Sequence, residues 1–256
     1  MNAPEKRAVA FLDIMGFKKL IEQAEKQRSM LEKFHGLKHV IESHVTRDND
    51  RLAPSVPPHV KPNYLFVSDS IILSAPLQSD GFDGLVVVSI KSIEIAHKLL
   101  EMGFLLRGGI AIGNVWHEPK NIFGTGYIEA YQLEESVKPP RIVLSKTATS
   151  HLREATHYNV PLNELGLWQK TKHYVYLDAL NPSYIRGIES HGRIEQAFSQ
   201  YRAYIYNALQ DAELSGGVRK KWDATRVQFN YAVKQHRVNV EPIPKPSPNY
   251  AAIRCS

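Results

Sequence analysis

The stretch AVAFLDIMGFKKL occupies residues 8–20 of this 256-residue chain. Its first part, residues 8–14, is apolar throughout except for Asp13, and a short run of this kind is typical of a buried strand. Gly16 then allows a tight turn. From residue 17 to about residue 45 the apolar residues recur at helical spacing. The stretch therefore predicts a strand that ends in an acidic residue and leads directly into a helix.

The segments that follow alternate between strand and helix patterns. Four prolines mark residues 48–62 as a loop. Residues 64–74 predict two strands joined by a tight turn at Ser68-Asp69-Ser70. Further on, we expect helices over residues 84–102 and 124–135 and strands over residues 104–115, 141–145 and 174–177. The order βαββαβαβ…β predicts an α+β fold in which helices pack on a mixed sheet.

The chain changes character after residue 180. Apolar residues between Ile194 and Leu209 fall on one helical face, and Gly216-Gly217 is predicted to end that helix. A second, basic helix is expected up to about Arg237. We therefore expect a core domain over residues 1–180, a helical extension over 181–241 and a proline-rich tail over 242–256.

Charge and composition narrow the class of protein. The formal net charge is +6, but residues 1–180 carry 21 basic and 20 acidic side chains, whereas residues 181–256 carry 11 basic and 6 acidic ones. The surplus is typical of a solvated face on the appended helices, and we expect no nucleic acid partner. No apolar run approaches the roughly 18 residues of a membrane span, and no signal-peptide pattern is present, so we expect a cytoplasmic protein without a membrane partner. The single cysteine, Cys255, excludes an intrachain disulfide.

Two acidic residues each lie where an apolar strand meets a turn: Asp13 in FLDIMGF and Asp69 in FVSDSIILS. A carboxylate among strand hydrophobes is costly unless it is paired or binds a metal ion. Together the two would form an all-oxygen site of the kind that Mg²⁺ or Mn²⁺ prefers. The alternatives are a helix cap for Asp13 and a turn residue for Asp69. Arg107, which begins RGGIAIG, would either pair with an acid or clamp a phosphate.

Four motifs occur in an order and spacing that resemble one enzyme family: FLDIMGF (11–17), SDSIILS (68–74), RGGIAIG (107–113) and NIFGTGYIEAYQLEE (121–135). The combination resembles class III nucleotidyl cyclases, and in detail the pyrimidine cyclases of the bacterial Pycsar anti-phage system. The match covers about residues 9–145. The resemblance implies a ferredoxin-like βαββαβ core with the C-terminal helices as an extension.

The resemblance also implies a role for each motif residue. Asp13 and Asp69 would be the catalytic residues that hold two divalent metal ions, Mn²⁺ or Mg²⁺, with the backbone carbonyl of Ile14 as a further ligand. The ribose 3′ hydroxyl would attack the α-phosphate and pyrophosphate would leave.

The triphosphate would lie over Gly16 and Phe17, where the N-terminus of a helix suits its charge, and Arg107 would contact the terminal phosphates. In this family each site lies between two protomers, so the resemblance implies a head-to-tail homodimer.

The sequence departs from the family pattern at residues for base recognition and for transition-state stabilisation. Leu65 stands where purine cyclases have a lysine, and Asn121 stands roughly at their base-reading position. Ile128 and Gln132 stand near their transition-state asparagine and arginine. The residues for adenine or guanine recognition are therefore missing, and the source of transition-state stabilisation is open.

A smaller base needs another polar contact, for which Asn63, Tyr64 and Asn121 are the candidates. We choose Tyr64 because a phenol both donates and accepts hydrogen bonds. Strand alternation argues against Tyr64, since it puts Asn63, Leu65 and Asp69 on one face and Tyr64 on the other.

The expected function is conversion of UTP to cyclic UMP, a second messenger that a separate effector would bind during anti-phage defence. General resemblance alone favours UTP over CTP. The alternatives are a cytidylate cyclase, a catalytically inactive nucleotide sensor on the same fold, and a nucleic-acid-binding module that uses the basic C-terminal region.

Overall fold

The computed structural model describes residues 3–41, 58–185 and 191–246. The end of the first predicted helix, most of the predicted proline-rich loop and residues 247–256 of the predicted tail lie outside the described residues. None of the helices in the described ranges combines the length and the apolar character that a membrane span requires.

The described elements are twelve strands, seven α-helices and three short 3₁₀ turns. The strands are β1 (Glu5–Met15), β2 (Asn63–Val67), β3 (Ser70–Pro76), β4 (Gln78–Ser79), β5 (Phe82–Asp83), β6 (Leu105–Glu118), β7 (Asn121–Gly124), β8 (Ile142–Leu144), β9 (Thr156–His157), β10 (Val160–Pro161), β11 (Trp168–Lys170) and β12 (Val175–Leu177). The helices are α1 (Phe17–Ala24), α2 (Arg28–Ile41), α4 (Gly84–Glu101), α5 (Thr125–Ser136), α6 (Lys146–Glu154), α7 (His191–Gln210) and α8 (Gly216–Gln235). The 3₁₀ turns are η2 (Pro58–Val60), η3 (Leu162–Glu164) and η4 (Pro182–Tyr184).

The central sheet has the order β11-β12-β8-β6-β1-β3-β2, with β7 paired to β6. The central strand β1 runs antiparallel to β3 and β6, and β6 runs parallel to β8. The first strands and helices follow a βαββαβ order, and their strands lie side by side as β6-β1-β3-β2, which is a ferredoxin-like arrangement. The predicted α+β fold with a mixed sheet is confirmed.

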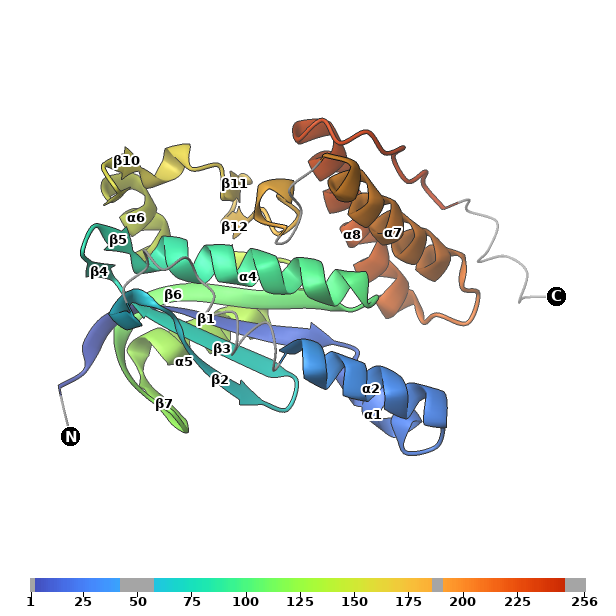
Figure 1. Cartoon of the computed structure of the whole chain (residues 1–256), viewed down its shortest axis with the longest axis horizontal. Coiled ribbons are helices and arrows are strands. Elements are labelled where there is room, and N and C mark those ends of the chain that lie inside the picture. Colours follow the sequence, from blue (N-terminus) through green and yellow to red (C-terminus); the bar gives the residue numbers. More distant parts are fainter. Residues whose placement is uncertain (1–2, 42–57, 186–190, 247–256) are drawn as a thin grey trace.

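The two faces of the sheet are covered unequally (Figure 1). The even-numbered residues 8–14 of β1 belong to the large core cluster that includes α4. The odd-numbered Val9 and Phe11 belong to a smaller cluster that includes Ala130 of α5. Because strand side chains alternate between faces, Asp13 projects toward the thinly covered face with α5.

Two glycines of RGGIAIG bring α5 against the backbone of β6. A Cβ atom at Gly109 would lie 2.4 Å from the carbonyl oxygen of Ala130, and one at Gly113 would lie 2.5 Å from the backbone nitrogen of Gly126. These glycines therefore admit a second backbone, and the contact at Gly109, which pairs with Phe11, lies toward the end of the sheet that carries Asp13.

The helices α7 and α8 pack on the core through buried aromatic side chains. Phe198, Tyr201 and Phe229 form a cluster that also includes Leu105 at the start of β6. His97 of α4 lies 3.0 Å from the carbonyl oxygen of Asn181 through Nε2 and 3.2 Å from the Tyr201 hydroxyl through Nδ1. Burial lowers the pKa of His97 to about 4, so the ring is neutral at physiological pH. The predicted boundary at residue 180 stays a prediction.

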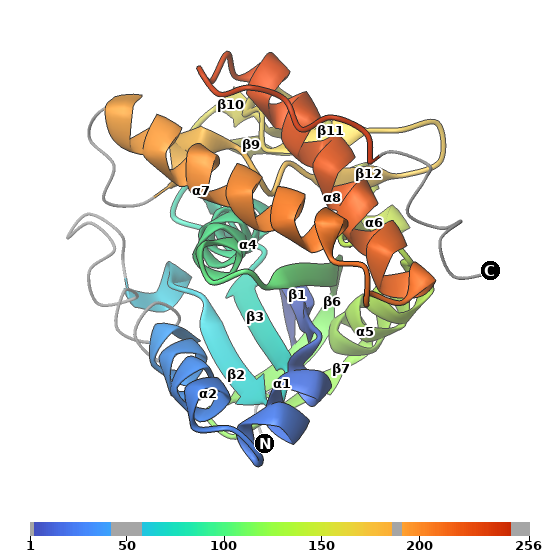
Figure 2. The same cartoon turned by 90° about the vertical axis from the view of Figure 1, so that its right-hand side faces the viewer.

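Both views place α7 and α8 at the same end of the molecule as α1 and α2 (Figures 1 and 2). The C-terminal ends of β1 and the β2–β3 hairpin point toward this end, which also carries the candidate site.

Several predicted elements need correction. The single helix predicted from residue 17 is two helices, because residues 25–27 form a turn between α1 and α2. Gly216-Gly217 does not end α7, which stops at Gln210. Instead the hydroxyl of Ser215 accepts a hydrogen bond from the backbone of Val218 (3.4 Å), so the two glycines form the first turn of α8. The short strands β4, β5, β7, β9, β10 and β11 and the helix α6 were not predicted.

Candidate active site

The two acids singled out in the sequence lie at neighbouring strand ends. The backbone N–H of Ile14 donates to the carbonyl oxygen of Asp69 (2.9 Å), and Asp13 pairs with Ser70 across the sheet. The predicted turn between β2 and β3 is confirmed, with Val67 opposite Ser70. Its first residue, Ser68, has a φ of 57°, a strained value for a residue with a side chain. The strained turn therefore holds Asp69 beside the end of β1.

Arg107 lies directly opposite Asp13 on the neighbouring strand β6. Its guanidinium donates to the Asp13 carboxylate (3.2 Å) and to the carbonyl oxygen of Val137 (3.2 Å). It also forms an ion pair with Glu134 of α5, whose side chain is only 5% exposed. Arg107 is thus held between two acids, and contact with a phosphate would require it to share or exchange these partners.

The positive charge of Arg107 does not fully offset the cost of burying the two carboxylates beside it. Burial raises the pKa of Asp13 more than Arg107 lowers it, and the nearby Asp69 raises it further. Burial likewise raises the pKa of Glu134 against the effect of Arg107, with Asp13 as an additional cause. The ionised forms of these acids would gain from another cation at the site.

The N-terminus of α1 adjoins these acids. Gly16 has a φ of 88°, which favours glycine, and no side chain caps the first turn of the helix. Phe17 is half-buried and packs edge-on against Phe34, with ring centroids 6.1 Å apart. The uncapped N–H groups are therefore available to an anion.

A cavity of about 380 Å³ lies beside Gly16 and joins α1 to the helical extension. Lys19 of α1, Lys33 of α2 and the half-buried Lys221 of α8 are among its lining residues. Within the described ranges none of these lysines forms an ion pair, and Lys33 lies 4.8 Å from the ring centroid of Phe104. The positive charge of Lys221 lowers the pKa of Asp13, against the larger effect of burial.

The structure separates two of the candidate base-reading residues, Tyr64 and Asn121, from Asp13. Tyr64 pairs with Leu73 and lies on the α4 face, opposite to Asp13. Asn121 pairs with Glu118, at the far end of β6 from Arg107. The alternation that argued against Tyr64 is confirmed.

The Asn63 side chain already has a hydrogen-bond partner within the chain. It lies on the same face as Asp13, but its side-chain oxygen accepts a hydrogen bond from Arg7 (2.6 Å). A base contact by Asn63 would therefore compete with this bond.

The donor set suits a hard divalent cation. Asp13 and Asp69 provide carboxylate oxygens at neighbouring strand ends, and Ile14 adjoins both, since it follows Asp13 in the chain and its N–H bonds to Asp69. Among the described residues no three histidine, cysteine, aspartate or glutamate side chains form a metal-sized cluster. The protein ligands would therefore be few, as is usual for Mg²⁺, which takes its remaining ligands from water and substrate phosphates.

Sequence reasoning missed two residues of this site. Glu134 follows Gly126 and Ala130 at intervals of four, and all three are buried on the sheet-facing side of α5. That spacing was a usable signal. Lys221 gave no local signal, because only the packing of α8 brings it to the cavity.

No family model matches the sequence, and no curated protein matches it. Among solved structures, an adenylate/guanylate cyclase/hydrolase from Silicibacter pomeroyi is similar, with 16% identity and a TM-score of 0.41 over 69% of this chain and 96% of that chain. The catalytic core of a rhodopsin-guanylyl cyclase with converted specificity, in complex with ATPαS, gives 14% identity and a TM-score of 0.41 over 69% and 97%.

Proposed function

We propose that this chain is a metal-dependent pyrimidine nucleotidyl cyclase that converts UTP to 3′,5′-cyclic UMP and pyrophosphate. The observation that carries the proposal is the convergence of Asp13 and Asp69 beside the uncapped N-terminus of α1. The sequence motifs around both acids resemble those of class III cyclases, which supports this reading of the geometry.

The proposed reaction is an internal displacement. The ribose 3′ oxygen forms a bond to the α-phosphorus, the bond from that phosphorus to the bridging oxygen breaks, and pyrophosphate leaves; the hydroxyl proton passes to solvent. Asp13, Asp69 and the Ile14 carbonyl would hold two divalent ions, which would lower the pKa of the attacking hydroxyl and neutralise charge on the leaving group. The N–H groups after Gly16 bind and orient the triphosphate.

Metal binding should be visible as a change in thermal stability. Because the pKa of Asp13 is raised, its ionised form costs folding free energy at neutral pH, and this cost disappears as the pH falls through the raised pKa. Asp13→Asn is therefore expected to melt above the wild type without metal. Mn²⁺ at about 100 times its Kd is expected to add about 2.7 kcal/mol to the free energy of unfolding of the wild type, which is roughly 5–10 °C in melting temperature for a chain of this size. The same Mn²⁺ should stabilise Asp13→Asn much less.

The measurement is a thermal melt at neutral pH with EDTA or Mn²⁺. Glu118→Gln, which removes an exposed acid at the far end of β6, is the control and should respond to Mn²⁺ as the wild type does. An equal Mn²⁺ shift in Asp13→Asn would remove Asp13 from the metal site.

We also propose that Lys221 binds the terminal phosphates of the substrate. It is half-buried in a cavity that also exposes Gly16, and its charge reaches Asp13. Lys221→Ala is expected to raise the KM for the nucleotide about 10-fold, the loss of one charge-assisted contact. Its neighbour Lys220 is exposed and does not line the cavity, so Lys220→Ala should leave the KM unchanged. Equal steady-state parameters for the two variants would contradict this role.

A homodimer would complete the site. The α5 face of the sheet leaves apolar side chains in solvent: Val67 is 54% exposed, Ile128 51% and Tyr131 39%. Of these, Tyr131 packs edge-on against Phe11 of the small cluster, with ring centroids 5.2 Å apart. We propose that a second copy of the chain covers these exposed apolar side chains, and it would also bring its own Asn121 toward a neighbouring Asp13.

The proposal for base recognition rests on the lack of a lysine at position 65. Leu65 lies on the same sheet face as Asp13, where a lysine would be needed to read a purine as the related enzymes do. We propose that Asn121 or Tyr64, from the partner protomer, contacts the smaller uracil; CTP is the alternative substrate. The product would act on a separate effector in anti-phage defence, and the chain would work in the cytoplasm.

Two other functions have specific support. Ile128 and Gln132 offer no cation to stabilise the transition state, and this favours an inactive nucleotide sensor. The basic residues beyond position 180 favour a nucleic-acid-binding module, which predicts DNA retention that weakens steeply with salt. Incubation with Mn²⁺ and each of the four nucleoside triphosphates separates both from a cyclase, because only a cyclase forms a cyclic product.

A further inference from the structure

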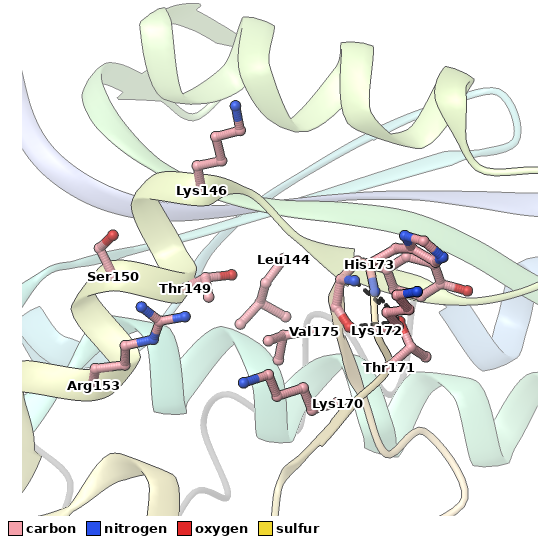
Figure 3. Close-up of a pocket in the computed structure, with 11 residues that line it drawn as sticks. Leu144, Lys146, Thr149, Ser150, Arg153, Lys170, Thr171, Lys172, His173 and Val175 are labelled. Atoms are coloured by element: carbon pink, nitrogen blue, oxygen red, sulfur yellow. Dashed lines mark hydrogen bonds between the residues drawn. The ribbon is translucent and has the colours of Figure 1, made fainter.

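A second cavity, of about 530 Å³, lies between α6 and the β11–β12 hairpin (Figure 3). Its lining residues come from the end of β8, one side of α6 and the hairpin, and they are Leu144, Lys146, Thr149, Ser150, Arg153, Lys170, Thr171, Lys172, His173, Tyr174 and Val175. None of them belongs to the candidate active site or to the cavity that Lys221 lines.

The lining carries four cations and no acid. Lys146 and Arg153 come from α6, and Lys170 and Lys172 from the hairpin. In the part of the chain that the structure describes, none of the four forms an ion pair. Figure 3 shows Arg153 and Lys170 extending toward each other from opposite walls. Like charges held around one concavity repel each other, and an anion between them would relieve the repulsion.

The wall formed by the hairpin is fixed by its own hydrogen bonds. Thr171 Oγ1 accepts from the backbone N–H of His173 (3.2 Å) and of Tyr174 (3.0 Å), and the backbone N–H of Thr171 donates to the carbonyl oxygen of Tyr174 (2.9 Å). Arg141 donates to the Tyr174 hydroxyl (2.6 Å). The cations on this wall are thus carried by an ordered turn, which reduces the entropy lost when a ligand binds.

The other parts of the cavity suit a compact polar ligand. Leu144 and Val175 are buried and form an apolar floor, and Thr149 and Ser150 of α6 also line the cavity. The Thr171 hydroxyl is used within the hairpin, where it also donates to the carbonyl oxygen of Tyr174 (3.0 Å). Hydroxyls, lysines and an arginine are common phosphate ligands. Figure 3 shows that Arg153 and Lys170 converge while Lys146 points away from them, and two converging cations favour a compact anion over a nucleic acid backbone.

We propose that this cavity is a second ligand site, which binds the di- or triphosphate group of a small molecule. The site is separate from the proposed active site, and its occupancy does not depend on a divalent metal ion held by Asp13 and Asp69.

The test is calorimetric titration of the full chain with inorganic triphosphate in EDTA. All variants carry Lys221→Ala, so that the first cavity contributes little. Adding Arg153→Ala and Lys170→Ala is expected to weaken binding at least 10-fold, whereas adding Lys120→Ala and Lys234→Ala, which remove two exposed cations elsewhere, should leave it unchanged. Arg153→Gln with Lys170→Gln repeats the test should the alanine variant fail to fold.

Equal triphosphate affinity in the two sets would overturn the proposal, as would tight binding of single-stranded RNA through Arg153 and Lys170 without binding of triphosphate. The Arg153 and Lys170 variants are also assayed for UTP cyclisation with intact Lys221. Retained cyclisation together with lost triphosphate binding supports a separate site, and an absence of cyclisation in the wild type would count against the proposed function alone.

Discussion

Asp69→Asn is expected to lower the rate of cyclic nucleotide formation at least about 10³-fold, which corresponds to about 4 kcal/mol of activation free energy. Asparagine keeps the size of the side chain and leaves the backbone bond from Ile14 to residue 69 in place. It removes one of the two carboxylates that would hold the metal ions. The fold should therefore survive while the chemistry is lost.

The rate is measured as the appearance of cyclic product with saturating Mn²⁺ and UTP. Asp80→Asn is a matched control, because Asp80, like Asp69, is an aspartate in a tight turn. Asp80 itself has a φ of 50°, and its carboxylate pairs with His59 and not with the candidate site. It should retain wild-type activity. A folded Asp69→Asn enzyme with more than a tenth of the wild-type rate would contradict the role of Asp69.

Ile128→Glu is expected to convert a dimer to monomers and to lower activity about 100-fold or more. The substitution puts a charge at a position of α5 that is 51% exposed in one chain and would be buried between two. Burial of an unpaired carboxylate costs several kcal/mol. Because the proposed site draws residues from both protomers, loss of the dimer removes activity as well.

Mass measurement by sedimentation, run beside the activity assay, tests this expectation. Val227→Glu makes the same kind of change on α8, at a residue that is 48% exposed, and should alter neither mass nor activity. A wild-type chain that is monomeric and fully active would rule out a site shared between protomers.

The local features of the fold could be predicted from the sequence because they depend on neighbours in the chain. The apolar run before Asp13 and the short turn at Ser68 and Asp69 each specify their own conformation, and the structure has both. The glycines of RGGIAIG admit a second backbone, but which helix approaches them, α5, follows from packing.

The rest of the site depends on contacts between distant segments. Arg107 was recognised as a cation that would pair with an acid or a phosphate, yet its pairing with both Asp13 and Glu134 requires the register of β1 and β6 and the position of α5. Lys221 reaches the cavity only because α8 crosses the end of the sheet. No periodicity in a single segment carries that information.

The C-terminal surplus of positive charge also gains a more specific interpretation. From sequence it is typical of a solvated helix face. In the structure one of these cations, Lys221, lies beside the candidate phosphate-binding helix end, whereas its neighbour Lys220 is exposed. The extension therefore has a proposed part in substrate binding.

The most direct test of the central claim is a product assay with four nucleotides. The purified full chain is incubated with Mn²⁺ and each of ATP, GTP, CTP and UTP, and the products are identified by chromatography and mass. We expect 3′,5′-cyclic UMP and pyrophosphate from UTP, and no product from Asp69→Asn. An absence of cyclic product from every nucleotide, in a protein that is folded and binds Mn²⁺, would contradict the account.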